Sequence, residues 1–243
     1  MDVVVATVAA IGSIVADLVT DLSPSTLGVA TGSSPQPVYA ELVRRRSITS
    51  DTRLFLLDDY VGLPVGDDHR YRCTIERQLA EPLGIPASNL FGPNVDDTDL
   101  DGAAQEYEQV ICSIGGVDLQ ICGLGQNGHL AFNEPGSSFD STTRVVELSA
   151  ATRADNARFF SGVDLVPHRA ITQGLATILS ASCIVLVVMG ESKASALAAC
   201  LDGPPTRRFP ASILQRHPRV VIVADRAALS MSTYRRDHQG IST

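Results

Sequence analysis

Short apolar runs alternate with helical patterns along the whole of this 243-residue sequence, and this alternation constrains the fold more than any other feature. Apolar strands that are separated by helices are typical of a mainly parallel sheet covered on both faces. We expect buried strands at residues 26–30, 53–57, 117–122, 144–148, 183–189 and 220–224. We expect helices at residues 35–46, 70–80, 100–113, 168–180, 193–201 and 212–217. In such α/β sheets, ligands bind at the carboxyl ends of the strands.

No internal repeat, low-complexity tract or Pro/Gly-rich linker divides the chain, so we predict a single domain over residues 1–243. Residues 3–16 are nearly all apolar, but Asp2 stands where a signal peptide carries a positive charge. The run is also too short to span a bilayer, and no later run reaches about 18 apolar residues. We interpret residues 3–16 as a helix of the domain, with the first strand abbreviated, and expect no membrane partner.

Charge and cysteine usage exclude several classes of function. The formal net charge is −8, and no Lys/Arg run is long enough to follow a nucleic-acid backbone, so nucleic acid is not an expected partner. The five cysteines are an odd number and form no CxxC pair, which favours buried reduced thiols in a cytoplasmic protein. No His/Cys/Asp cluster has metal-ligand spacing, so we expect no metal.

Two strand ends carry features that suit a phosphate group. Strand 26–30 runs into residues 31–34 (Thr-Gly-Ser-Ser) and then a helix, where glycine permits close approach and free N–H groups attract an anion. After strand 183–189, Lys193 falls in the first turn of a helix, where the dipole disfavours a cation unless an anion offsets it. Taken alone, residues 31–34 are more simply a capped helix start, and Lys193 is more simply a solvated lysine.

Two other strand ends carry titratable side chains. Asp58 and Asp59 follow strand 53–57 directly, and because buried charge is costly without partners, either a general base or an aspartate turn is compatible with them. The glycine-rich segment 123–136 presents His129 and Glu134 close together. Histidine titrates near neutral pH, and a nearby carboxylate can orient its ring. With Asp58 at a neighbouring strand end, we interpret His129 as catalytic.

The strings TGSSP, LDDYVGLP, GLGQNGHLAFNEPGSS, TRADNARFF and MGESKASAL occur in this order, within a match that extends roughly over residues 27–225. In this combination the sequence resembles the glucosamine-6-phosphate deaminases. The resemblance implies a three-layer α/β/α sandwich with a mainly parallel, Rossmann-like sheet. It also implies a phosphosugar substrate and the isomerisation and deamination of glucosamine 6-phosphate to fructose 6-phosphate and ammonia, in the catabolism of amino sugars such as N-acetylglucosamine.

The resemblance implies a role for each matching residue. Asp58 would move a proton between C2 and C1 of the open-chain sugar, and His129 would open the pyranose ring with Glu134 as its partner. The phosphate would be held by Thr31, Gly32, Ser33, Ser34, Arg158 and Lys193. The residues themselves give no independent reason to choose Arg158. Proton transfers of this kind require neither a metal nor a redox cofactor, so no cofactor is expected.

The sequence departs from the family pattern at Asn127, two residues before His129, where many members have Asp. An amide can hold the imidazole by a hydrogen bond, but it offers no charge to an imidazolium. We therefore include Asn127 in the catalytic set and expect ring opening here to depend less on a charged triad.

A second departure concerns regulation. Ser137, Ser138 and Arg144 match an allosteric phosphate site of longer members, but Val146 replaces the lysine expected there, so the site would be vestigial. The match therefore gives little support to regulation by N-acetylglucosamine 6-phosphate or to a hexamer. It leaves open whether the chain forms a homo-oligomer.

Other interpretations stay open. A 6-phosphogluconolactonase shares the fold and a glycine-rich His loop, but Tyr60 and residues 133–136 (Asn-Glu-Pro-Gly) argue against it. The galactosamine epimer differs by one hydroxyl orientation, which leaves little trace in a motif. A non-catalytic sugar-phosphate effector domain would not need Asp58 and His129, and the sequence has no DNA-binding segment. An inactive paralogue is suggested by Asn127 alone.

Overall fold

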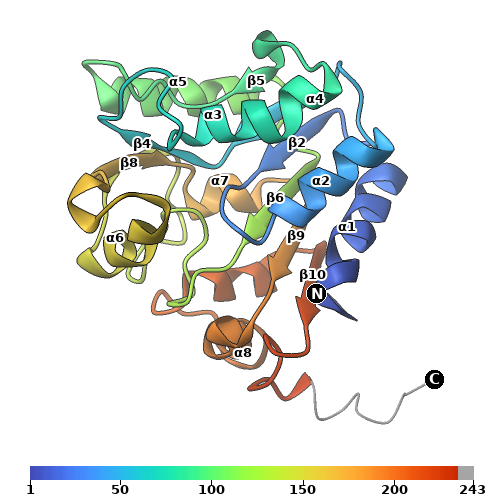
Figure 1. Cartoon of the computed structure of the whole chain (residues 1–243). Coiled ribbons are helices and arrows are strands. Elements are labelled where there is room, and N and C mark those ends of the chain that lie inside the picture. The colour runs from blue at the N-terminus through green and yellow to red at the C-terminus, as the bar shows by residue number, and fades with distance from the viewer. Residues whose placement is uncertain (235–243) are drawn as a thin grey trace.

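The computed structural model describes residues 1–234, and its main feature is a seven-stranded sheet in the order β1-β10-β9-β6-β2-β3-β5 (Figure 1). Every neighbouring pair in this sheet is parallel. Its strands are β1 (Asp2–Ala6), β2 (Thr26–Val29), β3 (Arg53–Leu56), β5 (Leu90–Phe91), β6 (Leu119–Gly123), β9 (Cys183–Val188) and β10 (Val220–Asp225). The predicted mainly parallel sheet is confirmed.

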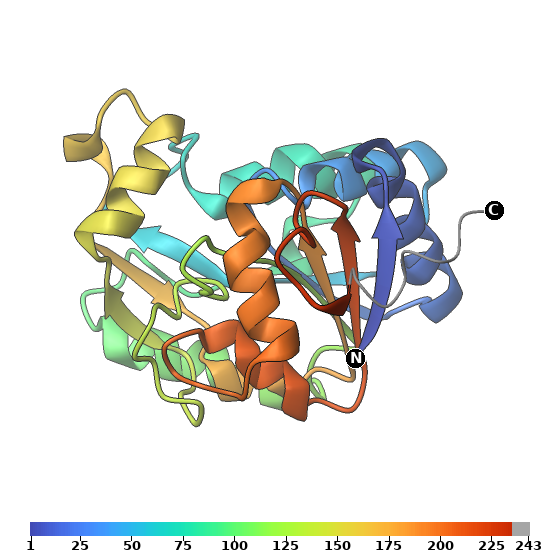
Figure 2. The same cartoon turned by 90° about the horizontal axis from the view of Figure 1, so that it is seen from below.

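Helices cover both faces of this sheet, because successive strand residues enter two different apolar cores. Val185 packs in the core formed with α1 (Val8–Leu22), α2 (Gln36–Arg45), α3 (Tyr71–Ile75), the π-helical turn η1 (Glu76–Ala80) and α4 (Glu81–Leu83). Leu186 packs in the other core, with α5 (Leu100–Ser113), α7 (Leu175–Leu179), α8 (Ala194–Asp202) and the 3-10 helix η6 (Pro210–Arg216). The sheet therefore lies between two helical layers, as the view from below shows (Figure 2), and the predicted three-layer α/β/α sandwich is confirmed.

A smaller antiparallel sheet, in the order β4-β8-β7, lies beside the large one. It consists of β4 (Asp58–Val61), β8 (Arg169–Thr172) and β7 (Arg144–Glu147). Between β7 and β8 the chain forms α6 (Ala150–Asn156) and the 3-10 turns η3 (Ala157–Phe159) and η4 (Val163–Leu165). We call residues 149–166, which contain these three elements, the α6 segment. It projects from the small sheet toward the viewer in Figure 1.

One glycine fixes the start of α2, where the predicted phosphate loop ends. A Cβ atom added at Gly12 of α1 would lie 2.4 Å from the carbonyl oxygen of Pro37. Only glycine therefore lets α1 approach the first turn of α2 this closely. The contact holds the N-terminal end of α2 against the sheet, next to residues 31–34.

Three sequence expectations were wrong or incomplete. Residues 3–16 are not one helix: Asp2–Ala6 form β1, which pairs with β10, and α1 begins only at Val8. The β-branched run at residues 3–5 gains a partner strand, and this tertiary pairing outweighs the apolar pattern that suggested a helix. The first strand is therefore complete, with five residues.

The predicted helix at 168–180 is a strand followed by a short helix, β8 and α7. The chain turns at Gly174, where a Cβ atom would lie 2.0 Å from the Ser141 carbonyl oxygen. The predicted strand at 144–148 exists as β7, but it belongs to the small antiparallel sheet and is half-exposed rather than buried on both faces. The pairing of β8 with strands that are distant in the sequence cannot be predicted from the local sequence pattern.

The other predicted elements are confirmed with shifted ends. Helix 70–80 continues to Leu83, and residues 191–193 form a 3-10 turn, η5 (Glu191–Lys193), before α8. The predicted helix at 212–217 is the 3-10 helix η6, and a further 3-10 turn, η2 (Ala87–Asn89), precedes β5. Over residues 1–234, no helix combines the length and apolar character needed to cross a bilayer.

Candidate active site

A cavity opens where β2, β6 and β9 of the large sheet end and where β3 passes into β4. Its walls come from these strand ends, from α3 and from the α6 segment. The lining includes Ala30, Thr31, Gly32, Ser33, Ser34, Leu57, Asp58, Tyr71, Gly125, His129, Phe132, Asp155, Asn156, Arg158, Phe159 and Lys193. Strand ends of a parallel sheet meet at one edge, so residues from most of the chain converge here.

Asp58 is the first residue of β4 and is 6% exposed in the floor of this cavity. Burial, and then the neighbouring charge of Asp59, raise the pKa of the Asp58 carboxyl well above its usual range. The backbone N–H of Phe132 donates to this carboxyl and opposes the shift. The result is a carboxylate that is more basic than an exposed aspartate, which suits proton abstraction.

Asp59 has a different task from Asp58. Its carboxylate accepts hydrogen bonds from the backbone N–H groups of Tyr60 (2.8 Å), Tyr71 (2.8 Å) and Arg72 (3.2 Å). Two of these groups belong to the first turn of α3. Of the adjacent aspartates, Asp58 therefore faces the cavity and Asp59 holds the start of a helix.

His129 is held by Asn127. Its Nδ1 lies 2.7 Å from the Asn127 Oδ1, and its backbone N–H donates to the same oxygen at 3.2 Å. Since two nitrogen groups converge on that atom, it is the amide oxygen, and the Nδ1 donates to it. This tautomer leaves the Nε2 lone pair free to act as a base.

The surroundings of His129 favour the neutral imidazole. Burial, and then the charge of Lys193, lower its pKa to about 4, while Glu134 and Asp155 act in the opposite direction. Gly125 makes the ring position accessible, because a Cβ atom there would lie 2.3 Å from the imidazole. Near neutral pH, the His129 imidazole is therefore neutral, and it lines the same cavity as Asp58.

Glu134 does not contact His129 in this structure. Its carboxylate accepts hydrogen bonds from the backbone N–H (3.1 Å) and hydroxyl (2.7 Å) of Ser149 and from the hydroxyl of Thr152. Ser149 is the N-cap residue of α6. Glu134 thus anchors the α6 segment and reaches His129 only through its charge, so its role as a direct partner stays a prediction.

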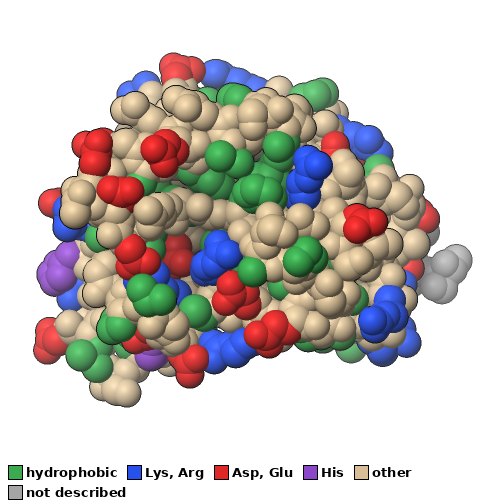
Figure 3. Space-filling view, turned by 90° about the horizontal axis from the view of Figure 1, so that it is seen from above, with side chains coloured by type: hydrophobic (Ala, Val, Ile, Leu, Met, Phe, Trp, Pro, Cys, Tyr) green, Lys and Arg blue, Asp and Glu red, His purple; other side chains and the backbone are tan. Residues whose placement is uncertain are grey.

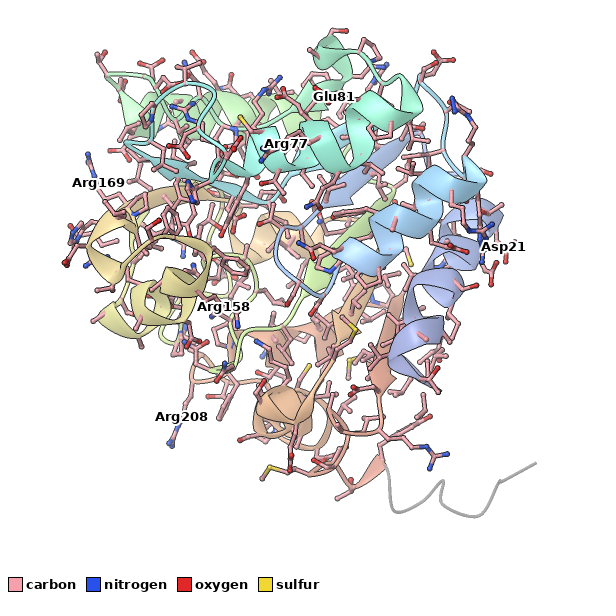
Figure 4. All side chains as sticks on the ribbon, in the orientation of Figure 1. Asp21, Arg77, Glu81, Arg158, Arg169 and Arg208 are labelled. Atoms are coloured by element: carbon pink, nitrogen blue, oxygen red, sulfur yellow. The ribbon has the colours of Figure 1, made fainter. Side chains whose placement is uncertain are left out.

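The predicted phosphate residues lie together. Residues 31–34 follow β2, Lys193 ends η5 after β9, and Arg158 lies in η3 of the α6 segment. Burial, and then Arg158, lower the pKa of Lys193, as expected for two cations that face one space. Arg158 is near the centre of Figure 4, with its guanidinium 4.8 Å from the Phe159 ring centroid.

Sequence reasoning missed several lining residues. The Tyr71 hydroxyl donates to the Tyr60 hydroxyl at 3.2 Å, and Asn156 Nδ2 donates to the Tyr60 hydroxyl at 2.8 Å. These bonds connect α3, β4 and α6.

Nothing in the local sequence singles out Tyr71, but Asp155 precedes Arg158 by three positions. A helical pattern over 150–158 would have placed those two side chains on one face.

Ser137, Ser138 and Arg144 lie together but outside this cavity. Arg144 donates to Ser137 Oγ at 3.3 Å and to Asn133 Oδ1 at 2.9 Å, and Arg207 donates to Ser138 Oγ at 3.2 Å. The group is therefore assembled, and its Arg144 is already occupied by internal acceptors. Its predicted vestigial regulatory role is untested.

Other ligand types find less support within residues 1–234. No group of three or more His, Cys, Asp or Glu side chains there is arranged to hold a metal ion, and all five cysteines are free thiols. On the face shown in Figure 3, acidic and basic side chains are interspersed around a central apolar area. That face offers no continuous basic surface of the kind that a nucleic acid requires.

The sheet order defines an α/β protein with a cavity at its strand ends, and comparison with known proteins identifies its family. The family model described as glucosamine-6-phosphate isomerases/6-phosphogluconolactonase matches residues 2–222. The chain belongs to this family.

Within the family, similar curated relatives are glucosamine-6-phosphate deaminases. That of Pseudarthrobacter chlorophenolicus is 44% identical over 227 residues, covering 90% of this chain and 88% of the relative. That of Beutenbergia cavernae is 49% identical over 209 residues, covering 84% and 80%. A solved monomeric glucosamine-6-phosphate deaminase superposes with a TM-score of 0.92 at 37% identity, covering 95% of this chain and all of that one. A Trypanosoma cruzi 6-phosphogluconolactonase gives 0.79 at 17% identity, which is a likeness of fold alone.

Proposed function

We propose that this chain converts glucosamine 6-phosphate and water to fructose 6-phosphate and ammonia. The observation that carries the proposal is the placement of Asp58 and His129 in the same cavity as Arg158, Lys193 and residues 31–34. A carboxylate of raised pKa and a neutral imidazole supply the two acid–base groups that an aldose–ketose conversion needs. The cations supply an anchor for the phosphate at the other end of the substrate.

The first step is ring opening at His129. The free Nε2 accepts the proton of the anomeric hydroxyl, and the resulting imidazolium returns a proton to the ring oxygen as the C1–O5 bond breaks. Asn127 keeps the Nδ1 proton in place throughout. Because an amide does not stabilise the imidazolium by charge, the imidazole remains a weak base with a strong tendency to give the proton back.

The second step is proton transfer by Asp58. Its carboxylate removes the proton from C2 of the open-chain aldehyde and delivers it to C1, while one proton of the ammonium group at C2 passes to O1. C1 thereby becomes CH₂OH, and C2 becomes an iminium carbon. Water adds to this iminium, and ammonia leaves as the C2–N bond breaks. The proton transfer balances without an external oxidant or reductant, and water is consumed only in the last step.

The decisive experiment measures ammonia release and fructose 6-phosphate formation from glucosamine 6-phosphate. We expect turnover by the wild type and a fall in kcat of about 10²–10⁴-fold in Asp58→Asn. Asp21→Asn is the matched control, because Asp21 undergoes the same chemical change on the outer surface of α1 (Figure 4). Absence of ammonia from the wild type would overturn the proposal.

The same assay separates the remaining candidates. The family includes 6-phosphogluconolactonases, so hydrolysis of 6-phosphogluconolactone is measured in parallel. Galactosamine 6-phosphate replaces the substrate in a third arm, because the epimer differs at one hydroxyl only. A binding-only protein would hold a phosphosugar in all arms without turnover.

We also propose that residues 1–243 act as one domain in the cytoplasm. Support for the compartment comes from the five free thiols, which fit a reducing environment. A similar deaminase of known structure is described as monomeric, and light scattering at several concentrations would test this for the present chain.

A further inference from the structure

Arg144 is a half-buried cation for which the described residues provide no carboxylate within 4.0 Å. Its guanidinium instead donates to three neutral oxygens: Asn133 Oδ1 at 2.9 Å, Ser137 Oγ at 3.3 Å and the Thr142 carbonyl at 3.4 Å. Burial lowers the pKa of Arg144, which means that its charged form is held at a cost. A half-buried charge without a carboxylate partner suggests that the Arg144 guanidinium has a specific role.

The shortest of these bonds fixes the orientation of the Asn133 amide. Asn133 is fully buried, and its Nδ2 donates to the Leu130 carbonyl at 3.0 Å and to the Gln173 carbonyl at 2.7 Å. If the amide were reversed, its NH₂ group would face the Arg144 donors and its oxygen would face two carbonyls. Arg144, which only donates, therefore selects the orientation in which Asn133 joins those carbonyls.

The two carbonyls belong to the surroundings of the two catalytic groups. Leu130 follows His129 directly in the chain. Gln173 donates its backbone N–H to the Leu57 carbonyl at 2.7 Å and its Nε2 to the Leu56 carbonyl at 2.9 Å, and Leu57 precedes Asp58. A path of peptide bonds and hydrogen bonds thus runs from His129 through Asn133 to the peptide group that precedes Asp58.

The register of the small sheet gives a second connection. Arg144 of β7 and Asp58 of β4 are both paired with Thr172 of β8, so the three residues form a row across the sheet. The Phe132 N–H, which donates to Asp58, also contacts Thr172 Oγ1 at 3.2 Å. Arg144 therefore lies about two strand spacings, or roughly 10 Å, from Asp58, too far for contact.

We propose that Arg144 is a positioning residue that sets the distance between His129 and Asp58 by orienting Asn133. The proposal rests on the proposed function for its kinetic consequences. It makes Arg144 necessary for the proton transfers but not for holding the phosphate. The phosphate residues belong to other elements, at the ends of β2 and β9 and in the α6 segment.

The main test compares Arg144→Met with Arg144→Lys. Methionine keeps the apolar stem but leaves the Asn133 oxygen without a donor, so we expect kcat for glucosamine 6-phosphate to fall at least about tenfold, with KM changed less than about twofold. Lysine retains one donor and should recover most of kcat. Arg169→Met is the matched control, because Arg169 lies on adjacent β8 and points outward (Figure 4); its kcat should stay unchanged.

A double-mutant cycle tests whether the effect passes through Asn133. In an Asn133→Ala background, Arg144→Met should reduce kcat no further, because the amide that it orients is gone. Multiplicative losses would overturn the proposed path. So would a fall in Arg144→Met that lysine does not restore, or a rise in KM that accounts for the loss of kcat/KM.

A readout without substrate separates this inference from the proposed reaction. The imidazole resonance of His129, assigned with His129→Gln, is titrated by NMR in the wild type, Arg144→Met and Arg169→Met. If the path is broken, His129 becomes less buried and its pKa should rise from about 4 in Arg144→Met alone. The charged groups that face it, Lys193, Glu134 and Asp155, are the same in all three proteins. An unchanged pKa would overturn the proposal even if the enzyme proved to have another activity.

Discussion

The two sheets of the molecule differ in burial and in what they bring to the site. The central strand β9 of the large sheet is buried along its whole length. In β7 of the small sheet, by contrast, three residues are half-exposed and the fourth is exposed. The large sheet leads into residues 31–34, Lys193 and the loop of His129, and the small sheet begins with Asp58. A buried sheet next to the proposed phosphate residues thus adjoins a more exposed sheet that carries the proposed base.

Leu57 is bonded to both sheets. The backbone N–H of Leu57 donates to the Val29 carbonyl of the large sheet at 3.3 Å, and its carbonyl accepts from Gln173 at the end of the small sheet at 2.7 Å. Because Asp58 is the next residue, the angle between the sheets determines where its carboxylate lies. The comparison therefore predicts that catalysis and binding respond to different substitutions.

The largest expected effect is on catalysis. His129→Gln keeps a side chain of similar size but removes the acid–base group, so kcat should fall by about 10²–10⁴-fold. KM should change little, because the phosphate residues are untouched. Steady-state kinetics on glucosamine 6-phosphate measures both values. A large rise in KM with kcat preserved would show that binding and ring opening are not divided in this way.

The next effect is on stability and compares the sheets directly. Leu186→Ala in β9 removes a fully buried side chain and should lower the free energy of unfolding by about 2–5 kcal/mol. Val145→Ala in half-exposed β7 should lower it by about 1 kcal/mol or less. Urea denaturation measures both. Equal losses would mean that the small sheet is as strongly held as the large one.

A smaller effect concerns the phosphate. Lys193→Met removes a charge-assisted contact with the phosphate, worth about 1.5–3 kcal/mol, so KM should rise about 10–100-fold with a modest change in kcat. Arg208→Met removes the same charge from an outward-pointing position (Figure 4) and serves as the control. If both variants behaved alike, net charge rather than the cavity would govern affinity.

The smallest effect is a shift in pH dependence. Asn127→Asp places a carboxylate beside the imidazole, which favours its protonated form and should raise the His129 pKa from about 4 by about one unit or more. The active base is then lost at a higher pH, so the acid limb of kcat/KM moves upward. Superimposable pH profiles would contradict a role for the amide in keeping His129 neutral.

The lowered pKa of His129 in the wild type also affects stability. The folded-state pKa of His129 lies below the ordinary 6.5, so folding favours the neutral form. The contribution of this preference to the free energy of unfolding is fully present above pH 6.5 and is lost as the pH falls from 6.5 toward 4. Asn127→Asp should reduce this acid-induced loss, which thermal unfolding between pH 4 and 7 can measure.

The sequence predicted β2, β3, β6, β9 and β10 of the large sheet because these strands are mostly apolar and buried, whereas β5, with two residues, is too short to give a pattern. It failed where pairing decides the structure. Residues 3–5 become a strand only because β10 lies beside them, and β8 was included in a predicted helix because its partners β4 and β7 lie far away in the chain. Contacts of this kind have no local pattern.

The candidate site was predictable where a motif carries the chemistry. Asp58, His129 and Lys193 stood out because a charged or titratable group followed an apolar strand, and the structure places all three in one cavity. The contacts of Glu134 with α6 and of Arg144 with Asn133 could not be predicted, because each depends on which neighbour the folded chain brings within about 3 Å.

The pairing of β1 with β10 has a consequence for synthesis. Among residues 1–234, β1 pairs with β10 at residues 221–225, so it cannot join the sheet until those residues have been synthesised. Until then an apolar, β-branched segment stays exposed, as late-pairing strands generally do. A nascent chain would therefore present β1 to chaperones until its partner strand β10 has been made.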